Sequence, residues 1–149
     1  MHLTRESEYA LRGMAYLASF PPGVVAALSE IAEAQALPGR FLAKIFQKLT
    51  RHGLVSAQRG RGRGYQLANS AESITLRQIL EAVEGPRLHQ LCMLWQRDCR
   101  DEDPCPLHHR LKDMVRELEW ILDHITLAQY VAELGELARH APVAEGSIT

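Results

Sequence analysis

The sequence has no apolar run long enough to span a membrane, and its N-terminus lacks the pattern of a signal peptide. Cysteine is scarce: there are three in 149 residues, at positions 92, 99 and 105. An odd number confined to one short stretch argues against a secreted disulfide framework. We therefore expect a cytoplasmic protein with no membrane partner, whose cysteines have a metal-binding or redox role.

Acidic residues are missing from one region of the chain. Residues 40–64 contain seven of the 17 Lys and Arg residues and no Asp or Glu, although the net charge of the whole chain is only −1. The remainder has ten basic against 18 acidic residues. A basic region in an otherwise acidic protein is typical of a surface that faces phosphates. The alternative is a solvated basic face without a partner.

The basic region itself has the pattern of a helix followed by a hairpin. Apolar residues at 42, 45, 46 and 49 form one helical stripe, and Gly53 suits a left-handed cap. Two short strands, 54–58 and 65–67, flank a loop of alternating Arg and Gly. The candidate DNA-binding residues are Arg40, Lys44, Gln47, Lys48 and Arg51 on the helix and Arg59, Arg61 and Arg63 in the loop.

Two further helices precede this region. The pattern predicts a helix over 5–19 capped by Thr4, and a short helix over 30–35 capped by Ser29. The fold class is therefore mostly α with a small β-wing, that is, a winged helix-turn-helix plus a long dimerisation helix. The basic helix would lie in the major groove of double-stranded DNA and the loop in a neighbouring minor groove. A winged helix that docks a protein is the alternative.

The C-terminal half contains the predicted dimerisation helix. Thr75 should cap a helix over 76–84 that ends at Gly85-Pro86, and a heptad seam then runs for about 40 Å from Leu107 to Ala132. Such a seam favours a homodimer, whereas a helix folded back on its own domain is the alternative. The expected organisation is a DNA-binding domain at 1–85, a cysteine loop at 86–106, a dimerisation helix at 107–139 and a flexible tail at 140–149.

The cysteine loop offers soft ligands for an iron–sulfur cluster, zinc or copper. It has no Cys-x-x-Cys pair of the kind found in structural zinc sites, and its longer gaps suit a bulkier inorganic core. The fourth ligand could be His108, the adjacent His109, or a carboxylate such as Glu8. The thiols could also be merely buried or reactive. No base with an orienting group accompanies them, so we do not expect an enzyme.

Taken together, these residues resemble the winged-helix iron–sulfur transcriptional regulators typified by IscR and NsrR, with CymR as a further relative. The resemblance covers residues 1 to about 135. Its motifs are the opening segment 3–12, the helix Phe41-Leu-Ala-Lys-Ile-Phe-Gln-Lys-Leu-Thr-Arg-His-Gly-Leu-Val55, the wing 59–65, the segment 74–85 and the three-cysteine loop. It implies a homodimeric regulator, most often a repressor, in which operator binding responds to a cluster that senses redox state, nitric oxide or iron–sulfur status.

Two kinds of ligand set follow from the resemblance. IscR-like members imply a 2Fe–2S cluster on Cys92, Cys99, Cys105 and His108, which we prefer. NsrR-like members imply a 4Fe–4S cluster with Glu8 of the other subunit as fourth ligand. The sequence departs from the family pattern at Arg63, where a glycine is common, and in a first cysteine gap one residue longer. Cluster-free relatives imply the alternative of control by a partner protein or by thiol oxidation.

Overall fold

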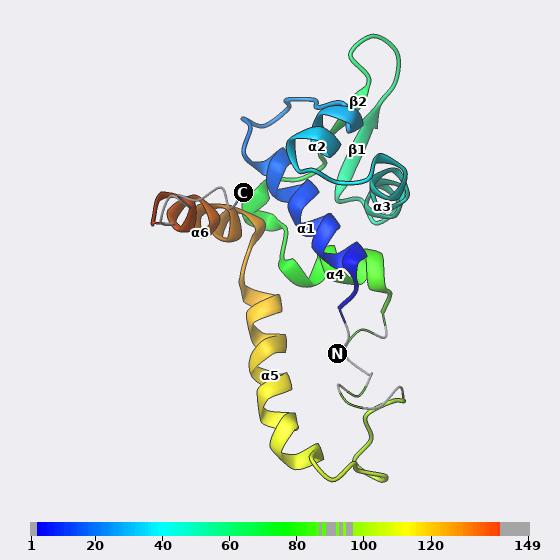
Figure 1. The fold of residues 1–149 in the computed structure, drawn as a ribbon, viewed down its shortest axis with the longest axis vertical. Helices are drawn as coiled ribbons and strands as arrows, with labels where there is room; N and C mark the ends of the chain where they lie inside the picture. Colours follow the sequence, from blue (N-terminus) through cyan, green and yellow to red (C-terminus); the bar gives the residue numbers. More distant parts are fainter. Residues whose placement is uncertain (1–2, 87, 89–91, 93, 95–96, 141–149) are drawn as a thin grey trace, which may run out of the picture.

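The computed structural model describes residues 3–86, 88, 92, 94 and 97–140. It has the predicted fold class, with helices throughout and a single antiparallel hairpin between the third and fourth helices (Figure 1). In order, the elements are α1 (Arg5–Ala18), α2 (Leu28–Ala34), α3 (Gly39–Arg51), β1 (Val55–Gln58), β2 (Gly64–Leu67), the short 3₁₀ helix η1 (Ala71–Ser73), α4 (Leu76–Glu84), α5 (His108–His124) and α6 (Leu127–His140).

The core of the N-terminal half lies where α1 meets α3. Thr4 caps α1 as predicted, because its side chain accepts from the backbone N–H of Glu6 at 3.1 Å. Met14 and Phe46 are fully buried in this core. Gly13 allows the close approach, since a Cβ at this position would lie 2.8 Å from Cε2 of Phe46. The amphipathic stripe of α3 is therefore anchored on α1, and its opposite face is left for solvent.

The second helix begins earlier than the sequence pattern indicated. It starts at Leu28 and its cap position is Ala27, so the prediction that Ser29 caps the helix was wrong. The Glu30 carboxylate accepts from the backbone N–H of Ala27 at 2.6 Å and so supplies the missing acceptor. A side chain three residues inside the helix has taken over the role expected of the cap residue.

The wing is tied to the rest of the fold at its base. Register pairs Val55 with Leu67 and Gln58 with Gly64. Tyr65 also exchanges backbone hydrogen bonds of 2.8 and 2.9 Å with Ala26, in the segment before α2. The hairpin is thus a two-stranded sheet extended by one bridge, and the arginine loop beyond it is exposed.

The end of α4 holds both α1 and α3. The Glu84 carboxylate accepts from the backbone N–H and hydroxyl of Thr4 at 2.8 and 2.6 Å, and from the hydroxyl of Ser7 at 2.5 Å. Burial opposes ionisation of Glu84, but these hydrogen bonds outweigh it and hold the pKa of the carboxyl below its ordinary value. On α3, Lys48 donates to the carbonyl oxygen of Val83 at 3.0 Å. The last turn of α4 therefore contacts both the start of α1 and the basic helix α3.

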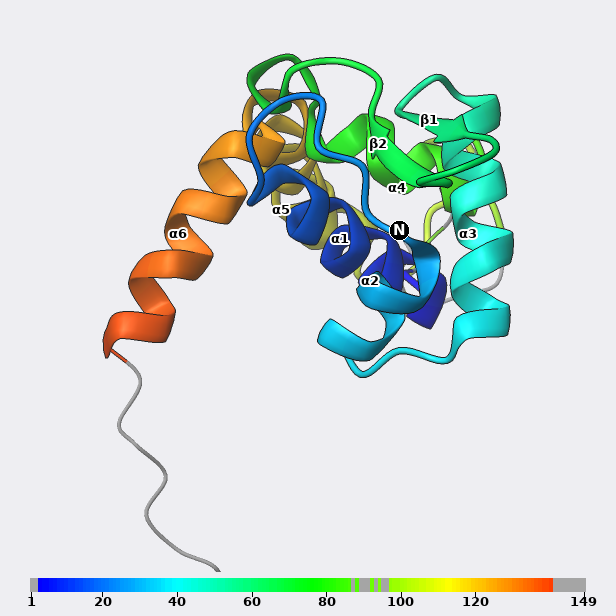
Figure 2. The same cartoon turned by 90° about the horizontal axis from the view of Figure 1, so that it is seen from above.

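The predicted dimerisation helix at 107–139 is not continuous. It breaks at Ile125 and Thr126, so that α5 and α6 are separate helices. Leu127, just after the break, is fully buried in the core of the N-terminal half, and Tyr130 packs against the same core. Figure 2 shows α6 running outward from the side of α1. The single long helix was therefore wrong, and the start of α6 instead folds back on its own domain.

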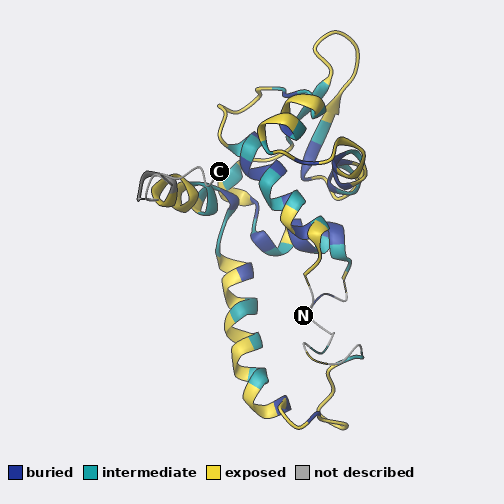
Figure 3. Ribbon diagram, in the orientation of Figure 1, coloured by how far each residue is buried: buried dark blue, intermediate teal, exposed yellow. Residues whose placement is uncertain are grey.

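Helix α5 extends away from the N-terminal half, and much of it is exposed (Figure 3). Its exposed residues include the large apolar side chains of Met114, Trp120 and Ile121. Its C-terminal part is fixed to α4, because Arg77 donates from Nη2 to Oδ2 of Asp123 at 2.9 Å and its Nε pairs with the other carboxylate oxygen. No helix among the described residues is long and apolar enough to cross a membrane. Most of the predicted tail 140–149 lies outside the described residues.

Candidate functional site

The functional residues that the sequence predicts lie on two surfaces. The first of these surfaces is basic. Four of the five predicted contacts on α3 are exposed on the side away from the buried stripe: Arg40, Lys44, Gln47 and Arg51. The arginines of the β1–β2 loop, at 59, 61 and 63, are also exposed. Figure 1 shows this loop projecting beyond the helices, next to α3. Helix and loop thus present cations on neighbouring parts of the surface.

Lys48, the fifth predicted contact on α3, has other partners. Its ammonium group forms an ion pair with Glu6 and donates to the carbonyl of Val83. The side chain is half-buried between α3, α1 and α4. Its charge is therefore directed toward the protein, where it holds the end of α3 against the last turn of α4.

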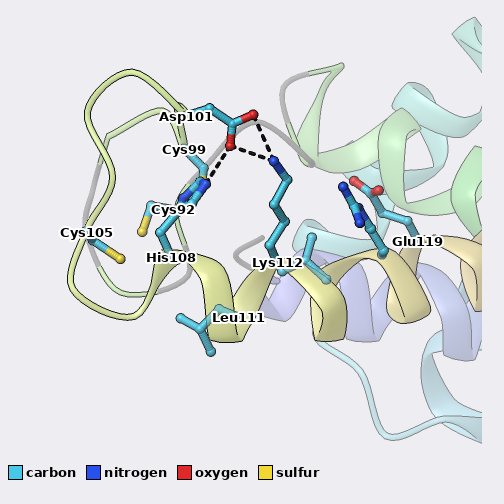
Figure 4. Close-up of a pocket in the computed structure, with 10 residues that line it drawn as sticks. Cys92, Cys99, Asp101, Cys105, His108, Leu111, Lys112 and Glu119 are labelled. Carbon is cyan, nitrogen blue, oxygen red and sulfur yellow. Dashed lines mark hydrogen bonds and ion pairs between the residues drawn. The ribbon is translucent and has the colours of Figure 1, made fainter.

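The second surface is the cysteine pocket, a cavity of about 230 Å³ beside the first half of α5. Cys92, Cys99, Cys105 and His108 all line it, as Figure 4 shows. The other lining residues are Asp101, Leu111, Lys112, Val115, Arg116 and Glu119. Cys105 and His108 are buried, Cys92 is half-buried and Cys99 is exposed. The fold therefore gathers at one cavity four donors that are spread over 17 residues of sequence.

A series of polar contacts runs from Cys99 through His108 and Asp101 to Lys112 on α5. Sγ of Cys99 lies 3.2 Å from Nδ1 of His108, whose Nε2 lies 2.7 Å from Oδ1 of Asp101. Lys112 donates to both oxygens of Asp101, at 2.6 and 2.8 Å. The hydrogen bond from Lys112, and then that from His108, lower the pKa of Asp101 to about 2. Lost hydration, and then the neighbouring Cys92, Cys105 and Asp101, raise the pKa of the Cys99 thiol.

The donor set of three thiols and an imidazole suits a soft metal or an iron–sulfur cluster. Among the described residues, no three His, Cys, Asp or Glu side chains converge on a point that could hold a single metal ion. The donors surround a cavity instead. Each iron of a cluster takes only some of the donors, so donors that line one cavity fit an iron–sulfur cluster.

The other two candidates for a fourth ligand lie differently. The ring of His109 packs edge-on against His108, with centroids 5.2 Å apart, and its side chain is exposed. Glu8 is on α1, where its carboxylate lies 3.2 Å from Arg12. Within one chain, His108 is thus the candidate that shares the cavity with the thiols.

Sequence reasoning did not identify Asp101 and Lys112 as part of this site. Asp101 is one of three acidic residues in a row of loop positions, so nothing in the sequence distinguishes it. Lys112 offered a signal, because it follows His108 by four residues and must share its helix face. The contact between the two depends on the loop path, which spacing alone does not give.

Comparison with known proteins places the chain in a family. Residues 3–133 match the family Rrf2, described as "Iron-dependent Transcriptional regulator". An HTH-type transcriptional regulator of Haemophilus influenzae is 33% identical over 131 residues, which cover 88% of this chain and 87% of that protein.

Solved structures agree with this match. The IscR structure from T. potens superposes with a TM-score of 0.73 at 25% identity, covering 95% of this chain and 93% of that one. CymR, the global cysteine regulator of B. subtilis, superposes with a TM-score of 0.74 at 24% identity, covering 89% and 98%. The basic helix and wing are therefore those of a DNA-binding regulator and not of an enzyme, and the chain belongs to the Rrf2 family of transcriptional regulators.

Proposed function

We propose that this regulator is a homodimeric, operator-binding repressor whose DNA affinity depends on an iron–sulfur cluster held by Cys92, Cys99, Cys105 and His108. The observation that carries the proposal is that all four side chains line the same cavity. A 2Fe–2S cluster is favoured, because His108 completes the set within one chain. A carboxylate from the partner subunit, Glu8 in sequence terms, would instead favour a 4Fe–4S cluster.

The basic surface is the proposed DNA contact. Recognition helices of winged helix-turn-helix proteins use their exposed face in the major groove, and a loop rich in arginine suits a narrow minor groove. We assign the major-groove role to Arg40, Lys44, Gln47 and Arg51, and the minor-groove role to Arg59, Arg61 and Arg63. Lys48 is left out of the contact set, because its ammonium group is paired with Glu6.

Helix α5 supports the homodimer. Met114 is 61% exposed, and Ile121, seven residues later on the same side of the helix, is 37% exposed, although both are large apolar side chains. An exposed apolar face on a helix that extends from its domain is typical of an interaction surface. A second copy is the simplest partner, since two reading heads on a two-fold axis match a pseudo-palindromic operator.

The route from the cavity to DNA follows from the end of α4. The cysteine loop starts directly after Glu84 and Gly85, and the preceding residue Val83 holds Lys48 of the basic helix. When bound, a cluster supplies an iron–sulfide core whose state changes with oxidation or nitric oxide. A different loop conformation would alter the last turn of α4, and thereby shift the population of α3 positions that fit the operator.

The test is purification without oxygen, followed by absorption spectra and a count of iron and sulfide per chain. Two of each and a visible chromophore are expected, with a changed spectrum in His108→Ala and an unchanged one in the neighbouring control His109→Ala. Gel shifts of the cluster-loaded and cluster-free protein should differ in operator affinity. Equal affinities would overturn the switch, and an in vitro transcription assay would reveal whether operator binding represses.

Control by a partner protein or by direct thiol oxidation is the second candidate, favoured by the exposure of Cys99. Reactive cysteines have a lowered pKa, because the thiolate is the nucleophile. The pKa of Cys99 is raised, first by lost hydration and then by nearby groups. A raised pKa leaves less thiolate for direct oxidation, whereas a metal displaces the thiol proton when it binds, so the raised pKa argues against the free sensor thiol and is compatible with ligation. A protein that stays colourless after reconstitution with iron and sulfide would reverse the preference.

A further inference from the structure

The ring of His108 is held from both sides. Nδ1 lies 3.2 Å from the sulfur of Cys99, and Nε2 lies 2.7 Å from the carboxylate of Asp101. The side chain of His108 is only 3% exposed, so its two ring nitrogens depend on protein groups for hydrogen bonds. The orientation of this buried ring therefore follows from what each neighbour can donate or accept.

The two neighbours fix which nitrogen carries the proton. A carboxylate is an acceptor only, so the short contact requires Nε2 to be the donor. In the neutral ring Nδ1 is then unprotonated, and its lone pair points toward the side of the cavity where the sulfur of Cys99 lies. We propose that Asp101, itself held by Lys112, is the positioning residue that fixes this tautomer of His108 and turns Nδ1 toward the three thiols.

Lys112 is needed because Asp101 is not buried. The Asp101 side chain is 66% exposed, and a free loop carboxylate would sample many positions. Lys112 lies one helical turn after His108 on α5 and donates to both oxygens of Asp101. The helix that carries His108 therefore also carries the cation that fixes its orienting carboxylate.

A second carboxylate of the loop provides a comparison. Asp103 is 69% exposed and forms an ion pair with Arg97, also in the loop. Asp101 and Asp103, two positions apart, therefore have different partners. Asp101 contacts His108 on α5, whereas Asp103 pairs with Arg97 within the loop. Only Asp101 can therefore set the tautomer of His108.

Histidines that bind metals usually donate their second nitrogen to a carboxylate or carbonyl, and loss of that partner weakens metal binding about 10- to 100-fold. The role of Asp101 in ligation rests on the proposed cluster function. Beyond that function, the ligating atom of His108 is Nδ1 and not Nε2. Asp101 and Lys112, which are outside the family's ligand pattern, tune the site.

The first experiment uses the full-length, metal-free protein with ring-¹⁵N histidine. A protected Nε2–H proton of His108 should be visible by NMR in the wild type and in Asp103→Ala. It should be lost to exchange with water in Asp101→Ala and weakened in Lys112→Met, and Asp101→Glu should restore it in part. An Nδ1–H signal in the wild type, or an Nε2–H signal that survives Asp101→Ala, would overturn the proposal.

The second experiment uses protein reconstituted with iron and sulfide. ¹⁵N coupling to the reduced cluster should come from Nδ1 of His108, and chelators should remove iron about tenfold faster or more from Asp101→Ala than from Asp103→Ala. Coupling from Nε2, or equal rates, would refute the positioning role. A colourless protein with the expected Nε2–H signal would refute the cluster function and leave the tautomer assignment intact.

Discussion

The wing can approach the segment before α2 because Gly64 has no side chain. A Cβ built at this position would overlap the carbonyl oxygen of Ala26, and would lie 2.7 Å from its carbonyl carbon and 3.0 Å from the backbone nitrogen of Ala27. All three are backbone atoms, which cannot rotate away as a side chain could. Gly64→Ala therefore forces β2 away from the segment before α2.

The loss of stability in Gly64→Ala can be estimated from the two ways in which the chain could accommodate the added methyl group. Keeping the bridge means overpacking, which costs about 1–3 kcal/mol. Releasing it sacrifices the two hydrogen bonds between Ala26 and Tyr65, at roughly 0.5–1.5 kcal/mol each. Because the chain adopts the cheaper solution, we expect a loss of about 2 kcal/mol in the free energy of unfolding. For a chain of this length that lowers Tm by about 4–8 °C.

The assay is urea unfolding and a thermal scan at one fixed protein concentration, with Gly39→Ala as the matched control. A Cβ at Gly39 meets no atom within 4 Å, and the residue starts a helix, so that variant should keep or slightly gain stability. Equal stability of the two variants would refute the reasoning. Operator affinity should also fall in Gly64→Ala, because the arginine loop would lose its fixed base.

Three further predictions concern DNA, acid and assembly. Arg59→Ala should weaken operator binding and lower the slope of log K against log salt by about 1, whereas Arg110→Ala on α5 should leave the slope unchanged. A slope unaffected by the first variant would count against a wing contact. The pKa of Glu84 is lowered on folding, so its carboxylate stabilises the fold above the unfolded-state pKa, and the effect fades as pH falls through the folded pKa. Acid unfolding curves of Glu84→Gln should therefore be flatter than those of the wild type in that window, and parallel curves would exclude the contribution. Met114→Glu should give monomers in sedimentation with little change in helix content, because the side chain is 61% exposed in the single chain; an unchanged dimer would move the interface elsewhere.

The sequence predicted the parts of the fold that depend on local patterns. The buried stripe of α3, from Leu42 to Leu49, follows from residue spacing alone, and so does the cap of α4 at Thr75. The partners of Lys48 could not be predicted in this way, because Glu6 and Val83 lie 42 and 35 residues away. The same applies to Asp101, whose role depends on how the cysteine loop returns to α5. Periodicity identifies a face, whereas its partners depend on tertiary packing.

The heptad pattern of the sequence gives no sign of the break between α5 and α6, but a second sequence pattern marks it. The heptad spacing continues through Ile125 into α6, and a periodic pattern cannot report a change of direction. Yet the segment Ile125-Thr-Leu-Ala-Gln129 repeats Ile74-Thr-Leu-Arg-Gln78, which begins α4. A Thr followed three residues later by Gln is a capping signature, and both copies form reciprocal side-chain caps.

The two copies also pair with each other. Leu76 donates its backbone N–H to Ile125 at 3.1 Å, and Leu127 donates to Ile74 at 2.7 Å, so Thr75 and Thr126 form an antiparallel bridge. Each segment needs extended backbone at its cap, and the bridge satisfies the N–H groups of both leucines, which open their helices without an intrahelical acceptor. Capping chemistry thus stops the helix where hydrophobic spacing would continue it, because a helix that ran on through Thr126 would lose the cap and the bridge together.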